Sequence, residues 1–140
     1  MKLIPINSGF LKLDGGAMFG VVPKRMWQKM NEPDENNLCT WAMRCLLIDT
    51  GERRILVDTG IGDKQDARFR SHFTPWGQEA FLQNLAAAGY HPEDITDVLL
   101  THLHFDHVGG AIQLDAKGNP EPTFPNARYW SNPLHLAWAL

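Results

Sequence analysis

The sequence contains few of the residues that mark several large classes of protein. Only two residues are cysteine, Cys39 and Cys45, six positions apart among apolar neighbours. This spacing argues against a disulfide framework and against a paired-cysteine metal site, so we expect two small, half-buried side chains. No apolar run reaches the roughly 18 residues that a membrane-spanning helix needs, and the first residues lack the apolar core of a secretion signal. These absences predict a cytoplasmic chain without a membrane segment.

The chain also lacks a large excess of positive or negative charge. Thirteen Lys and Arg face sixteen Asp and Glu, a formal net charge of −3, and the basic residues are scattered. Without a basic stripe there is no general attraction for nucleic acid or for an anionic membrane, so we expect neither as a partner. Apolar residues make up 44% of the chain and charged residues 21%, which is the balance of a single globular domain.

The apolar pattern predicts an α/β fold. Alternating or continuous apolar stretches of strand length, bounded by glycine and polar residues, mark the expected strands. These are residues 2–7, 10–13, 41–49, 54–58, 95–101, 111–115 and 127–131. Residues 41–49 and 54–58 are joined by a short glycine-containing turn and are expected to form a β-hairpin.

Two helices are expected. The first has Thr74 as its cap, repeats apolar residues at three- and four-residue steps, and ends at Gly89. The second follows Ser131 or Asn132 near the end of the sequence. Stretches without a sustained period are expected to be loops, and the longer one is a candidate binding loop or lid. They are residues 14–37 and 62–71.

The stretch THLHFDHVGG, residues 101–110, is the most distinctive part of the sequence. His102, His104 and Asp106 occupy alternate positions and would face one side of an extended segment. His107 needs a turn of the backbone, for which the two following glycines offer conformational freedom. Imidazole and carboxylate groups bind zinc, and a pair of divalent metals would activate water and polarise a carbonyl or phosphoryl oxygen. A solvated histidine-rich turn is the alternative, but the spacing favours a metal site.

Together with ILVDTG at residues 55–60, this stretch resembles the metallo-β-lactamase-fold hydrolases. The resemblance implies that the chain is the N-terminal half of an αβ/βα sandwich. It also implies that His102 and His104 bind one zinc ion and that Asp106 and His107 bind a second, with Asp106 orienting the attacking water as well.

Asp58 matches the aspartate that lies near the metal ligands in that family. The resemblance implies that its carboxylate fixes the tautomer and orientation of a ligand histidine. Without the resemblance, a turn residue ahead of Thr59 and Gly60 explains Asp58 equally well.

The segment GGAMFGVVPK, residues 15–24, resembles lactonase-like members of the family, including acyl-homoserine lactonase relatives. Met18 and Phe19 are therefore candidates for the pocket that receives the substrate's acyl chain. Packing beneath the loop is an equal alternative for both. Trp27 and Trp76 either line the entrance to such a pocket or are packing residues.

The family's metal centre has further ligands: a third histidine, a bridging aspartate and a last histidine. After His107 the chain contains a single histidine, His135, which lies in the expected last helix and reads as a helix-surface residue. His72 and His91 read as surface loop residues. We therefore expect residues 1–140 to be one truncated domain, whose site a missing C-terminal half or a second chain, as in a homodimer, would complete. Such a half would leave an apolar sheet face exposed.

For a complete protein, the resemblance implies a zinc-dependent hydrolase that opens a lactone of the acyl-homoserine-lactone kind, or an ester, by attack of a metal-held hydroxide. Phosphotriester or β-lactam hydrolysis would use the same residues. A different class stays open beside it: a catalytically incomplete half-domain that binds metal or a partner without turnover.

Overall fold

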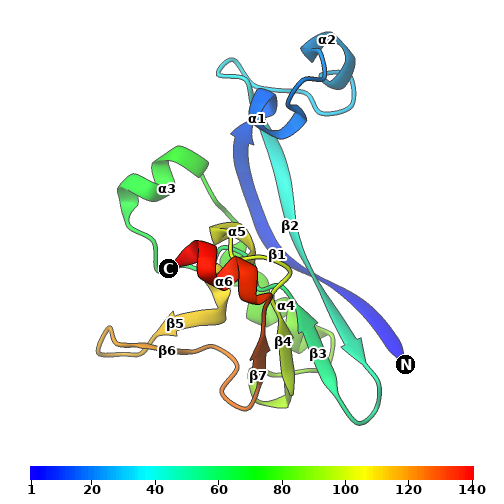
Figure 1. Cartoon of the computed structure of the whole chain (residues 1–140), viewed down its shortest axis with the longest axis vertical. Coiled ribbons are helices and arrows are strands. Elements are labelled where there is room, and N and C mark those ends of the chain that lie inside the picture. Colours follow the sequence, from blue (N-terminus) through cyan, green and yellow to red (C-terminus); the bar gives the residue numbers. More distant parts are fainter.

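A five-stranded sheet with the strand order β1-β2-β3-β4-β7 organises the chain, which a computed structural model describes over residues 1–140 (Figure 1). The strands β1, β2 and β3 are antiparallel neighbours, whereas β3, β4 and β7 run parallel. A separate two-stranded sheet pairs β5 with β6. Their bounds are β1 Lys2–Asp14, β2 Leu38–Asp49, β3 Arg54–Val57, β4 Asp97–Leu99, β5 Ile112–Leu114, β6 Pro120–Pro122 and β7 Arg128–Trp130.

The helices are short and join these strands. They are α1 Gly15–Phe19, α2 Lys24–Trp27, α3 Ala67–Phe73, α4 Phe81–Ala87, α5 Phe105–Val108 and α6 Pro133–Ala139, with 3-10 turns η1 Gln78–Ala80, η2 Pro92–Asp94 and η3 Gly109–Ala111. None of them has the length and apolar character that crossing a membrane requires. Helices and a mixed sheet together confirm the α/β class.

The long β1–β2 hairpin departs from the sequence prediction. Residues 2–7 and 10–13 form one continuous strand, interrupted only by a register shift between Asn7 and Phe10. At its far end the predicted loop 14–37 contains α1 and α2 (Figure 1). The buried Trp27 ring stacks on Phe19, with ring centroids 4.8 Å apart. Aromatic stacking of this kind gives the segment a small core of its own, which periodicity could not indicate.

The helix predicted from Thr74 begins later. Thr74 is the C-terminal cap of α3, with a φ of 42°, and α3 begins within the predicted loop 62–71 and ends two residues beyond it. Trp76 then exchanges both backbone hydrogen bonds with Phe10, at 2.8 and 3.0 Å. This pairing holds the chain extended against β1, so α4 starts only at Phe81. The expected last helix is confirmed as α6, and the side chain of Asn132 accepts a hydrogen bond from its first turn.

The main core lies on one face of the sheet, beneath α4. Phe81 and Leu85 of α4 pack there against Leu47, Leu56 and Val98. Cys45 belongs to the same core and Cys39 is also buried, so both cysteines are free but fully buried rather than half-buried.

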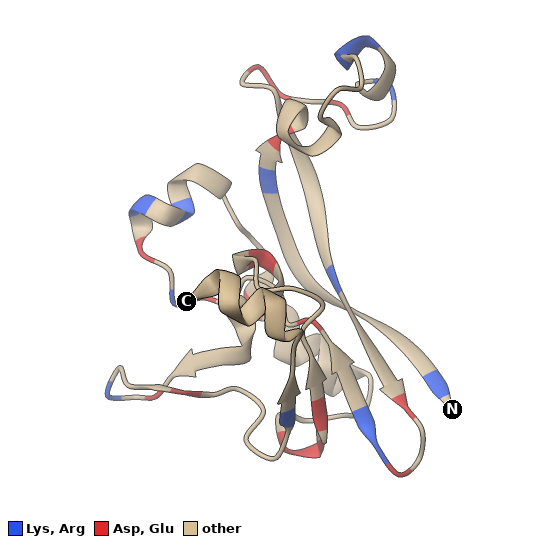
Figure 2. Ribbon diagram, viewed as in Figure 1, with Lys and Arg blue, Asp and Glu red and all other residues tan.

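The opposite face of the sheet is apolar but open. Leu99 and Trp130 face each other across β4 and β7, and they remain 41% and 42% exposed. This agrees with the expected exposed sheet face. Lys and Arg are dispersed over the β1–β2 hairpin with α2, over α3 and over the strand ends, while α6 carries no Asp, Glu, Lys or Arg (Figure 2).

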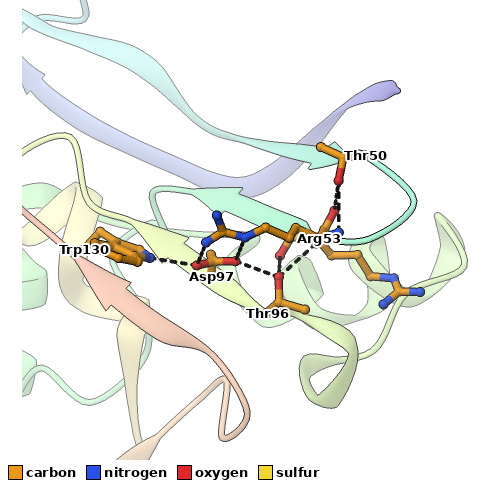
Figure 3. A network of polar contacts seen from close by, with 6 residues as sticks. Thr50, Arg53, Thr96, Asp97 and Trp130 are labelled. Carbon is orange, nitrogen blue, oxygen red and sulfur yellow. Dashed lines mark hydrogen bonds and ion pairs between the residues drawn. The ribbon is translucent and has the colours of Figure 1, made fainter.

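A buried carboxylate at the start of β4 connects this strand to β7 and to the turn before β3 (Figure 3). Asp97, 2% exposed, accepts hydrogen bonds from two Arg53 guanidinium nitrogens, from the Thr96 hydroxyl at 2.7 Å and from Trp130 Nε1 at 2.7 Å. The Arg53 hydrogen bonds hold the pKa of Asp97 well below its usual range. The network therefore links the hairpin before β3 to β4 and β7.

We expect Asp97→Asn to lower the free energy of unfolding at pH 7 by about 2 kcal/mol, because the charge-assisted bonds are lost. A carboxyl whose folded pKa is depressed stabilises the fold above its unfolded pKa of about 3.9, and this contribution disappears as the pH falls. The difference between wild type and variant should thus narrow below about pH 4. Urea unfolding at pH 7 and pH 3 measures it. Glu35→Gln, at an exposed residue outside the ion pairs, is the control; a constant difference at both pH values would contradict the prediction.

Candidate metal centre

Three histidine rings meet at the ends of two parallel strands. Asp58 follows β3 directly, and THLHFDHVGG follows β4, so both segments emerge at the same edge of the sheet. The extended part ends at His104. The carbonyl of His104 accepts hydrogen bonds from the backbone N–H groups of His107 and Val108, both at 3.0 Å, and these bonds form the turn of α5. This turn returns His107 to His102, with ring centroids 4.0 Å apart, and His102 lies 4.6 Å from His104. Asp106 therefore lies in a helical turn and not, as predicted, on an extended segment.

Asp58 connects the two strand ends. It is 8% exposed, and its carboxylate accepts hydrogen bonds from the Thr101 backbone N–H at 2.8 Å, the Thr101 hydroxyl at 2.8 Å and His107 Nδ1 at 2.8 Å. Because Nδ1 of His107 carries the donated proton in this pairing, its Nε2 is left with a lone pair. That Nε2 lies 3.5 Å from Asp106 Oδ2. The hydrogen bond to Asp58 thus holds the ring of His107, and a carboxylate acceptor favours the tautomer with the proton on Nδ1.

The two loops that carry these residues interlock through their backbones. The N–H and hydroxyl of Thr59 both donate to the His107 carbonyl, at 2.8 and 2.9 Å, and Gly110 N donates to Gly60 O at 2.9 Å. A Cβ at Gly109 would lie 2.0 Å from Ile61 O, and one at Gly110 would lie 2.2 Å from Thr59 O. Neither Gly109 nor Gly110 has a positive φ. Their role is close backbone approach rather than the conformational freedom predicted for them.

The donor types of the cluster fit a zinc-like metal, but their number falls short. Burial, followed by the charges of the neighbouring imidazoles, lowers the pKa of His102, which favours the neutral ring that binds metals. No three histidine, cysteine, aspartate or glutamate side chains are arranged to hold a metal ion together. A catalytic zinc usually has three protein ligands and a water. The cluster therefore fits part of a metal centre.

A hollow of about 300 Å³ opens beside Asp106 and His107. Its apolar wall comes mostly from β1 and β2 and consists of Leu11, Met18, Trp41, Ala42, Met43 and Cys45. Met18, which is 46% exposed, is one of the two predicted pocket residues. The other, Phe19, does not line the hollow, because its ring is stacked on Trp27. Of the two alternatives, pocket or packing, the structure therefore favours packing for both Phe19 and Trp27.

Trp76 lies away from this hollow, stacked on Phe10 at a centroid distance of 5.5 Å. Aromatic residues that the sequence did not single out are nearer the cluster. Phe105 packs against Phe69 and Phe73 of α3, with centroids 5.1 and 4.5 Å apart. The sequence does not predict this contact, because most of α3 lies in a stretch expected to be a loop. The four-residue spacing of Phe69 and Phe73 was the one feature of the sequence that indicated a helix here.

Helix α6 borders the cluster on another side. His135 lies 6.2 Å from His102 and Trp138 lies 5.7 Å from His104, measured between ring centroids. These residues line a second hollow of about 250 Å³. His135 is half-buried and faces the cluster, so it is not the plain helix-surface residue expected. His72 and His91 are exposed as expected, although His72 lies on α3 and not in a loop.

Comparison with known proteins finds the same family over most of the chain. A family model described as the metallo-beta-lactamase superfamily matches residues 44–127. N-acyl homoserine lactonase AiiA of Bacillus thuringiensis subsp. kurstaki is 35% identical over 85 residues, which are 53% of this chain and 32% of that protein. A probable metallo-hydrolase of Mycobacterium tuberculosis is 40% identical over 108 residues, which are 67% of this chain and 35% of its relative.

Solved structures extend the likeness to nearly every residue. A probable metal-dependent hydrolase from Staphylococcus aureus has a TM-score of 0.87 at 33% identity, covering 97% of this chain and 48% of its own. AidC, a dizinc quorum-quenching lactonase in complex with a product, has a TM-score of 0.71 at 26% identity, covering 97% of this chain and 43% of its own. These matches confirm the resemblance predicted from the motifs. The chain spans about a third of these curated relatives and less than half of these solved structures.

Proposed function

Because the chain belongs to the metallo-beta-lactamase superfamily, we propose that it acts, within a complete protein, as a zinc-dependent hydrolase that opens a lactone of the acyl-homoserine kind or a related ester. The observation that carries this proposal is the meeting of His102, His104 and His107 with Asp106 beside an apolar hollow. The lactonases among its relatives support the choice of substrate.

Each side chain then has a defined task. His102 and His104 would hold one metal ion, and Asp106 and His107 a second. Bound metal ions supply activation of water at neutral pH and polarisation of the substrate carbonyl. Asp58 keeps the Nδ1 proton of His107 in place, so that the lone pair on Nε2 faces the centre. The carboxylate of Asp106 would also accept a hydrogen bond from the attacking water and so orient it.

The apolar hollow suits the non-reacting part of the substrate. Met18 offers a flexible, polarisable side chain from α1, and Trp41 and Met43 extend this surface along β2. Such a wall binds an acyl chain by removing apolar surface from water. Phosphotriester or β-lactam hydrolysis would use the same donors, and the acyl-binding wall is the reason to prefer the lactone.

The remaining ligands would come from outside residues 1–140, which we take to be a single truncated domain. Two donors for each metal are fewer than the three protein ligands of a typical catalytic zinc. An apolar surface is open to the missing segment or to a second chain, which could be a second copy in a homodimer. It consists of the sheet face around Leu99 and Trp130 and of α6. The second candidate function follows from the same shortage of donors: a half-domain that binds metal or a partner without turnover.

We expect the chain to bind zinc, and His104→Ala to weaken that binding about 100-fold or more, because it removes one of the two donors proposed for one metal ion, a larger loss than that of a residue which only orients a ligand. Equilibrium dialysis with metal analysis measures this, and His91→Ala, at an exposed histidine, is the matched control. Zinc binding that His104→Ala leaves unchanged would contradict the proposed centre. Lactone and ester turnover by the complete protein, absent in its His104→Ala variant, separates the hydrolase from the half-domain without activity.

A further inference from the structure

Lys64 contacts the backbone that follows the metal-centre turn, at Gly109 and Ile112. It lies in the loop between β3 and α3, and its ammonium donates hydrogen bonds to Gly109 O and to Ile112 O, the latter at 3.0 Å. It belongs to no ion pair of the chain. Its charge is therefore directed at two backbone carbonyls, those of the first residue of η3 and of its C-terminal cap, shortly after Asp106 and His107.

Both carbonyls lie where the regular backbone pattern offers few donors. Gly109 is the C-terminal cap of α5, and the last carbonyls of a helix lack partners within it. Ile112 faces Pro122 across the β5–β6 pair, while Thr123 N donates to Ala111 O at 3.0 Å. In an antiparallel ladder this register directs the Ile112 carbonyl away from β6. A flexible ammonium with three N–H groups can serve both carbonyls at once.

We propose that Lys64 is a positioning residue, which acts through Gly109 and Ile112 to hold the turn carrying Asp106 and His107 against the strand end carrying Asp58. The hydrogen bonds of Thr59 to His107 and of Gly110 to Gly60 fix one side of this turn. Lys64 fixes the other side, where the chain leaves for β5. We call this pair of hydrogen bonds from Lys64 to Gly109 O and Ile112 O the clamp. Its effect on metal binding rests on the proposed function, whereas the clamp itself is a property of the metal-free chain.

Hydrogen exchange of the metal-free chain tests the clamp. Lys64→Met keeps the aliphatic stem and removes the donors, so amides of residues 105–112 should exchange about tenfold faster, since two hydrogen bonds that close this segment are lost. Lys64→Arg restores donors and should return exchange close to the wild-type rate. Lys117→Met, at the exposed tip of the β5–β6 turn, is the control and should change nothing in this segment. Unchanged exchange in Lys64→Met, or faster exchange throughout the chain, would overturn the proposal.

Metal binding tests whether the clamp positions the centre. Lys64→Met should bind zinc about tenfold more weakly and shift the visible absorption of bound cobalt(II), whereas Lys64→Arg should resemble wild type in both. Faster exchange with unaltered zinc affinity and cobalt spectrum would reduce Lys64 to a clamp of the fold and overturn its positioning role. If wild type itself binds no zinc, the proposed function fails, and exchange confined to residues 105–112 still decides whether Lys64 holds this turn.

Discussion

Gly109→Ala is expected to lower the free energy of unfolding by about 4 kcal/mol or more, the largest effect of any single methyl group added to this chain. The new Cβ would lie 2.0 Å from Ile61 O and 2.6 Å from the Ile61 carbonyl carbon, which are backbone atoms that cannot turn aside. Relief requires separation of the two loops, and that would break the hydrogen bonds that Thr59 and Gly60 make with His107 and Gly110. Zinc binding should be lost together with stability.

Urea unfolding followed by circular dichroism measures this loss. Gly110→Ala should behave similarly, because its Cβ would lie 2.2 Å from Thr59 O. Gly16→Ala is the matched control, because Gly16 is exposed on α1 and the atom nearest to its new Cβ would be a carboxylate oxygen of Asp14, the movable end of a side chain. A Gly109→Ala chain as stable as Gly16→Ala would show that the two loops do not interlock.

Asp58→Asn is expected to weaken zinc binding about 10–100-fold while most of the fold survives, as is typical for partners that orient a ligand histidine. Asparagine tolerates the positive φ of 59° at this position. It also retains one oxygen for the Thr101 N–H. Its amide N–H₂ cannot accept the proton of His107 Nδ1, so the ring must rotate or change tautomer.

Two measurements separate this effect from simple destabilisation. Nitrogen chemical shifts of the His107 ring should show the proton leaving Nδ1 in Asp58→Asn, and zinc affinity should fall in parallel. Asp63→Asn, at an exposed carboxylate farther along the same loop, should alter neither. Wild-type zinc affinity in Asp58→Asn, or an unchanged tautomer, would contradict the orienting role. Asp58→Ala should also lower the free energy of unfolding, by about 3 kcal/mol, because the Thr101 N–H loses its acceptor and alanine is strained at the positive φ of this position.

The candidate site was predictable in its residues but not in its shape. The spacing of His102, His104 and His107 after an apolar strand indicated a metal centre, and the turn that returns His107 to His102 was foreseen. The helical form of that turn was not, because it depends on hydrogen bonds to His104 O. The resemblance of residues 15–24 leaves Phe19 as either a pocket residue or a packing residue, and its stacking on Trp27 favours packing. Lys64 carried no motif at all, since its partners are carbonyls some 45 residues or more away.

By itself, the sequence determined the α/β class, the last helix, the hairpin of β2 and β3, and the set of imidazoles and carboxylates available for metal binding. These follow from local periodicity, capping residues and the chemistry of side chains, which neighbours in the chain already specify. Only the tertiary structure decided that Thr74 ends a helix, that Gly109 and Gly110 are there for close contact, and that β5 pairs with β6 while β7 joins β4. Each of these depends on a partner distant in sequence, and long-range packing overrides local preference wherever the two compete.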